Sequence, residues 1–125
     1  MQNRGKSFGK AYMAFQYGDE KIFSQNIRHA GYDDFRTIAG DASTFDWSRV
    51  GPVGCMHLDI DLYLPTLKIL RGVWDHLVEG GGVVVDDCLP DSPYDGALQA
   101  YEEFIAEKGL PFRRSGSKGG LVIKS

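Results

Sequence analysis

The stretch CMHLDIDLYLPTLKILRGVWDHLVEGGGVVVDDC, residues 55–88, decides the fold of this chain. It reads as an apolar run ending in carboxylates, an amphipathic segment, a glycine-rich turn and a second apolar run ending in carboxylates. This order predicts a strand, a helix and a second strand parallel to the first. The carboxyl ends of parallel strands meet at one edge of the sheet, where open α/β folds bind ligands. Asp59 and Asp61 are therefore expected to face Asp86 and Asp87 across one small site.

The overall composition is that of one globular domain with a small-molecule ligand. With 125 residues, 42% of them hydrophobic, the chain can bury roughly two thirds of its unfolded surface. Lys and Arg number 14 against 17 Asp and Glu, a net charge of -3. No global positive field therefore favours a nucleic acid or an anionic membrane as partner.

Cysteine content and apolar run lengths indicate a cytoplasmic protein. No apolar run approaches the roughly 20 residues of a membrane span, and residues 1–18 lack the apolar core of a secretion signal. We expect Cys55 and Cys88 to be reduced. A buried disulfide between them is the alternative.

The chain before the central stretch predicts one helix and one strand. Residues 1–18 show no sustained periodicity and are interpreted as an irregular N-terminal segment. Asp19 is expected to cap a helix that Gly31 terminates. Residues 35–39 (FRTIA) predict a short strand, and Gly40, Asp41 and Ala42 form the turn at its carboxyl end, which would open on the ligand edge.

The remaining patterns predict two helices, a strand and a hairpin. Pro65 is expected at the first position of a helix whose apolar spacing continues to Val78, with Gly80–Gly82 as the turn after it. The elements expected next are a strand over 83–85, a helix from about 95 to 109, and a hairpin over 112–114 and 121–124. Together these elements predict an α/β three-layer, Rossmann-like fold with parallel strands and a C-terminal antiparallel hairpin.

Four carboxylates at two strand ends are the main candidate for chemistry. Neighbouring strands lie about 4.8 Å apart, so these acids can share a divalent ion, and oxygen ligands suit magnesium, manganese or calcium. The alternative is that single aspartates cap the next helix or accept bonds from loop amides. In a strand, His57, Asp59 and Asp61 share one face, with Asp61 nearest the open edge. His57 is then either a base or, as we prefer, a hydrogen-bonded core histidine.

Two other patterns are set aside. Gly80–Gly82 follows a helix and precedes a strand, which is the reverse of the order that directs backbone amides at a phosphate. The Asp86-Asp87 pair is similar to the acidic pair of response-regulator receiver domains. That pair belongs at the end of the first strand, however, and here it comes late in the chain.

The residues from His57 to Cys88 resemble the metal-dependent class I S-adenosylmethionine methyltransferases of the macrocin O-methyltransferase type, which methylate sugar hydroxyls in antibiotic biosynthesis. The motif Leu-Asp-x-Asp-Leu-Tyr, followed by Pro-Thr, Gly-Gly and Val-Asp-Asp, carries the resemblance. The flanking residues 23–43 and 94–112 agree with it. The resemblance covers about residues 20–125, the C-terminal half of such an enzyme, without its glycine-rich donor strand and its second, acid-ended strand.

The resemblance implies a site and a mechanism. It implies that Asp59, Asp86 and Asp87 bind Mg²⁺, that Asp61 is the general base, and that Gly40, Asp41 and Ala42 lie near the adenine of S-adenosylmethionine. Methyl transfer would proceed with inversion, with the ion bound to adjacent hydroxyls of the acceptor, lowering their pKa and orienting one of them.

We therefore expect a Mg²⁺-assisted O-methyltransferase acting on a sugar or similar small polyol. Residues 1–125 would form a single partial methyltransferase domain, of which 19–125 are the C-terminal half of the fold. A homo-oligomer or a partner chain would supply the missing half. The alternatives are a non-catalytic module that keeps a cation or polyol site, and a metal-dependent phosphohydrolase, which would call for additional histidines.

Overall fold

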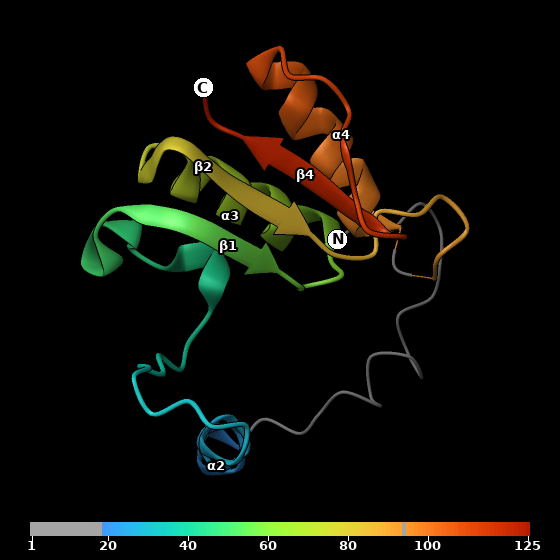
Figure 1. Ribbon diagram of the computed structural model, residues 1–125. Coiled ribbons are helices and arrows are strands. Elements are labelled where there is room, and N and C mark those ends of the chain that lie inside the picture. The colour runs from blue at the N-terminus through green and yellow to red at the C-terminus, as the bar shows by residue number, and fades with distance from the viewer. Residues whose placement is uncertain (1–18, 94) are drawn as a thin grey trace. The chain divides into compact units, whose positions relative to one another are not determined.

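The structure, a computed structural model, describes residues 19–93 and 95–125, which form two compact units, 19–41 and 42–125 (Figure 1). The predicted irregular segment over residues 1–18 lies outside the described residues. That the whole chain is one partial domain stays a prediction. None of the described helices is both long and apolar enough to cross a membrane.

The first unit contains the predicted helix but not the predicted strand. Helix α2, Glu20–His29, begins at Asp19, whose carboxylate accepts a hydrogen bond from the Lys21 amide at 2.8 Å, and it ends before Gly31, which has a φ of +92°. Residues 35–39 form no regular secondary structure, so that prediction was wrong. A strand needs a hydrogen-bonded neighbour, and all pairing among the described strands occurs within residues 42–125.

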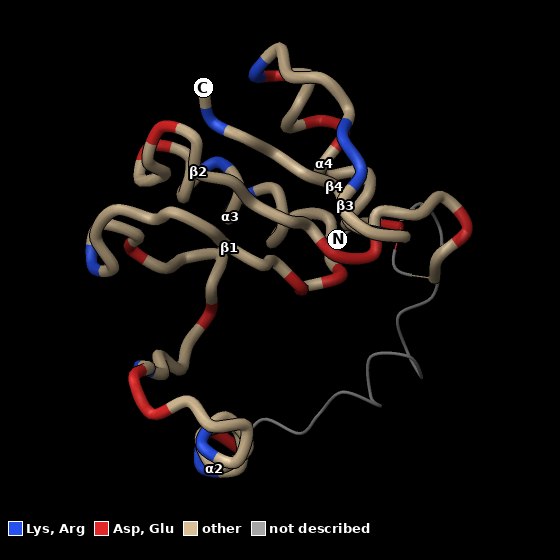
Figure 2. Tube along the Cα trace, in the orientation of Figure 1, with Lys and Arg blue, Asp and Glu red and all other residues tan. Residues whose placement is uncertain are grey.

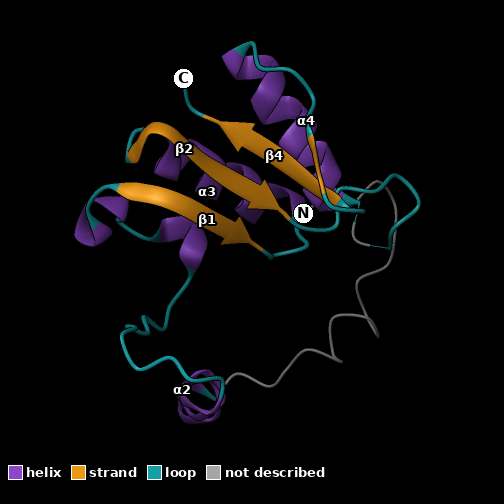
Figure 3. Ribbon diagram, viewed as in Figure 1, coloured by secondary structure: helices purple, strands orange, loops and turns teal. Residues whose placement is uncertain are grey.

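The second unit is built on a four-stranded mixed sheet in the order β1-β2-β4-β3 (Figure 3). Strands β1 and β2 are parallel, whereas β4 runs antiparallel to both β2 and β3. The predicted parallel pair and C-terminal hairpin are thus confirmed. The elements of this unit are η1 Ala42–Thr44, η2 Trp47–Val50, β1 Val53–Leu58, α3 Tyr63–Trp74, β2 Leu77–Val85, α4 Gly96–Lys108, β3 Arg114–Ser115 and β4 Gly119–Ile123.

Helices α3 and α4 pack against one face of this sheet and pass behind it in Figure 1. Val83, Val85 and Val122 point to that face and are at most 1% exposed. Residues that alternate with them point to the opposite face, where Cys55 and His57 are exposed. Residues 42–125 therefore supply two layers of the expected fold, the sheet and one helical layer.

Aromatic residues of α4 fix the hairpin and the core. The Tyr101 hydroxyl accepts a hydrogen bond from the Arg113 amide at 2.9 Å and lies 3.0 Å from the carbonyl oxygens of Arg113 and Leu121. A Cβ atom at Gly120 would lie 3.0 Å from the Tyr101 ring, so glycine permits this close approach. Phe104 is fully buried, and its ring packs edge-on against Trp74 at 5.5 Å.

Two details of the predicted elements were wrong. Pro65 is the third residue of α3, not the first, and it is tolerated there because amides of the first helical turn have no intrahelical acceptor. Gly80–Gly82 lie inside β2. A Cβ at Gly81 would come within 2.8 to 3.1 Å of the carbonyl oxygens of Val78, Gly54 and Val53, so this irregular start of the strand needs glycine.

Cys55 and Cys88 form no disulfide in the structure, and the reduced state of the chain stays a prediction. Cys55 is exposed on β1, whereas Cys88 is buried behind the end of β2. Burial raises the pKa of the Cys88 thiol to about 11, so this sulfur stays protonated at neutral pH and belongs to the core.

Candidate metal centre

The register of the parallel strands brings the predicted acids together. Leu58, the last residue of β1, pairs with Val85, the last residue of β2. The Asp86 amide donates to the Leu58 carbonyl oxygen at 2.9 Å, which extends the pairing by one residue. Asp59 and Asp86 therefore emerge side by side, and Figure 2 shows acidic positions at the ends of both strands.

Three carboxylates form a compact cluster at this edge. Asp59, Asp86 and Asp87 each offer an oxygen, and these oxygens lie within 4.8 Å of one another. Asp59 is exposed, and the other two are half-buried. Asp87 has a φ of +53°, a left-handed conformation that aspartate tolerates better than most residues, and its amide donates to the Asp86 carboxylate at 2.9 Å. The predicted juxtaposition of these three side chains is confirmed.

Asp61 belongs to the same electrostatic environment. Burial is the main cause that raises its pKa to about 6, and the charges of Asp59, Asp87 and Asp86 raise it further. Strand β1 ends at Leu58, and Asp61 has a φ of +65°, so strand alternation does not place Asp61 on the face of Asp59 as expected. The loop conformation places it instead.

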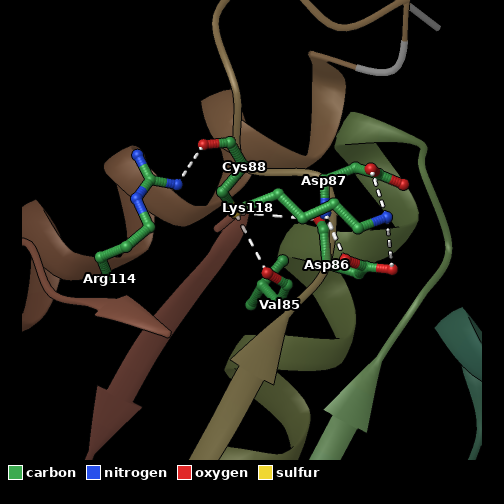
Figure 4. Close-up of polar contacts among 6 residues, drawn as sticks. All are labelled: Val85, Asp86, Asp87, Cys88, Arg114 and Lys118. Carbon is green, nitrogen blue, oxygen red and sulfur yellow. Dashed lines mark hydrogen bonds and ion pairs between the residues drawn. The ribbon is translucent and has the colours of Figure 1, made fainter. Parts of the chain in front are cut away.

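Lys118 bridges two of the acids, a contact that the sequence analysis missed (Figure 4). Its Nζ lies 2.9 Å from Oδ1 of Asp87 and 3.3 Å from Oδ2 of Asp86. These hydrogen bonds raise the pKa of Lys118 to about 12. No local sequence signal reveals this contact, because it depends on the antiparallel pairing of β4 with β2, which places the residue just before β4 at the edge where β2 ends.

Backbone contacts hold the chain just after the acids. The Cys88 amide donates to the Lys118 carbonyl oxygen at 2.8 Å, and Nη1 of Arg114 donates to the Cys88 carbonyl oxygen at 2.7 Å. Figure 4 shows Arg114 on one side of Cys88 and the Lys118 ammonium beside both aspartates. The β3–β4 hairpin thus fixes the position of Asp86 and Asp87.

The other predicted site residues lie away from this cluster or in the other unit. His57 is exposed, opposite Val84 in the register, so its interpretation as a core histidine was wrong. Gly40 and Asp41 belong to the first unit, and Ala42 begins the second and packs against its core. An adenine-binding role for this turn stays a prediction.

The donor set fits a hard divalent cation. Carboxylate oxygens are the ligands Mg²⁺ prefers, and oxygens around an octahedral Mg²⁺ lie about 3 to 4.2 Å apart. Small side-chain rotations bring oxygens that are within 4.8 Å to that spacing. Burial is the main cause of the raised pKa of Asp61, and the nearby charges of Asp59, Asp87 and Asp86 add to it; a bound cation would relieve that second, electrostatic part. Asp59, Asp86 and Asp87 are therefore the residues that could hold such an ion.

Comparison with known proteins identifies the class of fold. No family model and no curated protein sequence matches this chain. The solved structure of the O-methyltransferase NovP is similar, with a TM-score of 0.68 and 20% identity over 86% of this chain and 45% of that one. CalS11, the TDP-rhamnose 3'-O-methyltransferase of calicheamicin biosynthesis, has a TM-score of 0.56 and 19% identity over 69% of this chain and 39% of its own.

These similarities establish that residues of this chain adopt part of a methyltransferase fold. The chain spans less than half the length of the solved structures that it matches. The predicted fold class, a truncated α/β methyltransferase fold, is confirmed.

Proposed function

We propose that this chain is the C-terminal half of a Mg²⁺-dependent, S-adenosylmethionine-dependent O-methyltransferase that acts on a hydroxyl of a sugar or similar small polyol. The single observation that carries the proposal is the cluster of Asp59, Asp86 and Asp87, whose carboxylate oxygens lie within 4.8 Å. The fold shared with NovP and CalS11 supports the reaction class.

Each residue of the cluster has a distinct role in this proposal. Asp59, Asp86 and Asp87 would hold Mg²⁺, which supplies charge that lowers the pKa of an acceptor hydroxyl when it is bound. Asp61 would accept the proton of that hydroxyl. Its pKa of about 6 suits a base that works near neutral pH, since it is mostly ionised there and still a better proton acceptor than an ordinary aspartate.

The donor site and the partner complete the proposal. Gly40, Asp41 and Ala42 would contact the adenine of S-adenosylmethionine, which supplies the methyl group when it is bound. In this proposal the remaining strands of the fold come from a partner chain or a second copy and pair with β1, which is the outermost of the described strands on its side of the sheet. The proposal places the protein in the cytoplasm, where thiols such as those of Cys55 and Cys88 stay reduced. Neither a nucleic acid nor a membrane is part of the proposal.

Metal binding is the property that tests the proposed site. Titration with Mn²⁺, followed by calorimetry, is expected to show saturable binding to the parent protein. Asp86→Asn combined with Asp87→Asn should abolish it, because two of three charged ligands are lost. Asp33→Asn with Asp34→Asn is a matched control, since these adjacent aspartates are exposed in the first unit. Equal binding by the parent and the Asp86 and Asp87 double variant would place the ion elsewhere.

A further inference from the structure

Lys118 lies where a cation would neutralise the proposed ligands Asp86 and Asp87. Its single ammonium group contacts both carboxylates, at 3.3 Å and 2.9 Å (Figure 4). These carboxylates are two of the three acids that would hold Mg²⁺. The ammonium group and the metal ion would therefore compete for the same two carboxylates.

The fold presents this lysine from a fixed backbone. Val85, the last residue of β2, pairs with Gly120 in β4, so the hairpin turn lies beside the acids. The hydrogen bond from the Cys88 amide to the Lys118 carbonyl oxygen, at 2.8 Å, holds the turn there. The Lys118 side chain itself is 47% exposed, so it can rotate into solvent without disrupting the core.

An ammonium group and a divalent cation do not share this site easily. Like charges within about 4 Å of each other repel even in bulk water, and they repel more strongly near a protein surface. Binding of a divalent ion to Asp86 and Asp87 would thus favour the departure of Lys118. The lysine stem is long and flexible enough for that movement.

We propose that Lys118 is a tethered counter-ion, which holds Asp86 and Asp87 together in the metal-free protein and is displaced when the divalent cation binds. This inference rests on the proposed function, because it assumes that the cation binds at these acids. Lys118 lowers the affinity for the metal and, in exchange, limits repulsion among the carboxylates when no metal is present.

Removal of the ammonium group should strengthen metal binding. We expect Lys118→Met to raise the affinity for Mn²⁺ by roughly 2- to 30-fold, the fold-change that corresponds to the loss of two exposed ion pairs. Lys118→Gln should behave likewise, while Lys118→Arg, which keeps the charge, should stay close to the parent. Lys68→Met removes the same charge from an exposed position on α3 and serves as the matched control. Calorimetric titration of the full chain with Mn²⁺ measures all five proteins.

Thermal unfolding gives a second readout that does not depend on the titration. Without metal, Lys118→Met should melt at a lower temperature than the parent, because repulsion among the acids is no longer relieved. Saturating Mn²⁺ should then raise the melting temperature more in Lys118→Met than in the parent. Lys68→Met should show the parental pattern under both conditions.

The outcomes separate this inference from the proposed function. Unchanged affinity in Lys118→Met, together with loss of binding when Asp86 and Asp87 are both replaced by Asn, would overturn the inference and leave the metal site standing. Weaker binding in Lys118→Met would show that the lysine orients the ligands and would also overturn it. Absence of Mn²⁺ binding in both the parent and Lys118→Met would overturn the metal site and the inference together.

Discussion

Asp61→Asn is expected to lower the rate of methyl transfer by roughly 10²- to 10⁴-fold, the usual effect of losing a general base. The amide keeps the shape of the side chain but cannot accept the proton of the acceptor hydroxyl. The measurement is methyl transfer from labelled S-adenosylmethionine to a sugar acceptor, with the N-terminal half of the fold supplied in the same chain or by a partner. Mn²⁺ affinity should change little.

Neighbouring variants distinguish the base from the metal ligands. Asp59→Asn should weaken Mn²⁺ binding and methyl transfer together, because Asp59 is a proposed ligand. Full turnover by Asp61→Asn, with an inactive His57→Ala that still binds Mn²⁺, would show that His57 is the base and that the role given to Asp61 is wrong.

The pH dependence of stability provides an independent check on Asp61. Its pKa is raised from 3.8 to about 6, so the folded, metal-free protein binds this proton more tightly than the unfolded chain does. The contribution of Asp61 to the free energy of unfolding is therefore greatest below about pH 4 and is lost as the pH rises through 6. Asp61→Asn should remove this component from a series of urea denaturations.

Phe104→Ala is expected to lower the free energy of unfolding by about 3 to 5 kcal/mol, the range measured for large-to-small aromatic substitutions in cores. Phe104 is fully buried between α4 and the rest of the core, and it packs against Trp74. Small domains are stable by only about 5 to 15 kcal/mol, so much of the stability would be lost. Urea denaturation followed by circular dichroism measures the change.

Phe112→Ala is the matched control for that substitution. Phe112 is 47% exposed, and its ring centroid lies 5.3 Å from that of Tyr101. The expected loss in the free energy of unfolding is therefore smaller. If both variants lost the same stability, the core assigned to α4 would be wrong.

The central part of the fold could be predicted because its signals are local. The uninterrupted Val83–Val85 run, the apolar spacing of α3 and Gly109 after α4 each specify an element through neighbouring residues. The strand expected at residues 35–39 failed for the opposite reason. Its β-branched content is local, but strand formation requires a hydrogen-bonded partner elsewhere in the chain.

The glycines of β2 show another limit of local patterns. Gly80–Gly82 have the composition of a turn, yet they lie in β2. Glycine is needed there because the backbone of β1 approaches Gly81 too closely for a side chain. Such an approach depends on tertiary contacts. The glycine pattern therefore predicted a turn and assigned Leu77 and Val78 to the helix before it, whereas both residues lie in β2.

Part of the candidate site could be predicted from the order of the elements, and the rest depends on tertiary contacts. Asp59, Asp86 and Asp87 could be placed together because parallel strands align their carboxyl ends, a rule of topology that needs only the order of elements. Lys118 follows Asp87 by 31 residues and comes from a hairpin turn. Its contact depends on the pairing of β4 with β2, which the sequence alone did not assign.

The most direct measurement of the central claim is a crystal structure of the protein grown with Mn²⁺, examined by anomalous scattering at the manganese edge. The account predicts one strong peak with oxygens of Asp59, Asp86 and Asp87 at about 2.1 Å, the distance typical of Mg²⁺ and similar ions, and with the Lys118 ammonium turned away. A peak at other residues, with Lys118 still bridging Asp86 and Asp87, would contradict the proposed metal site.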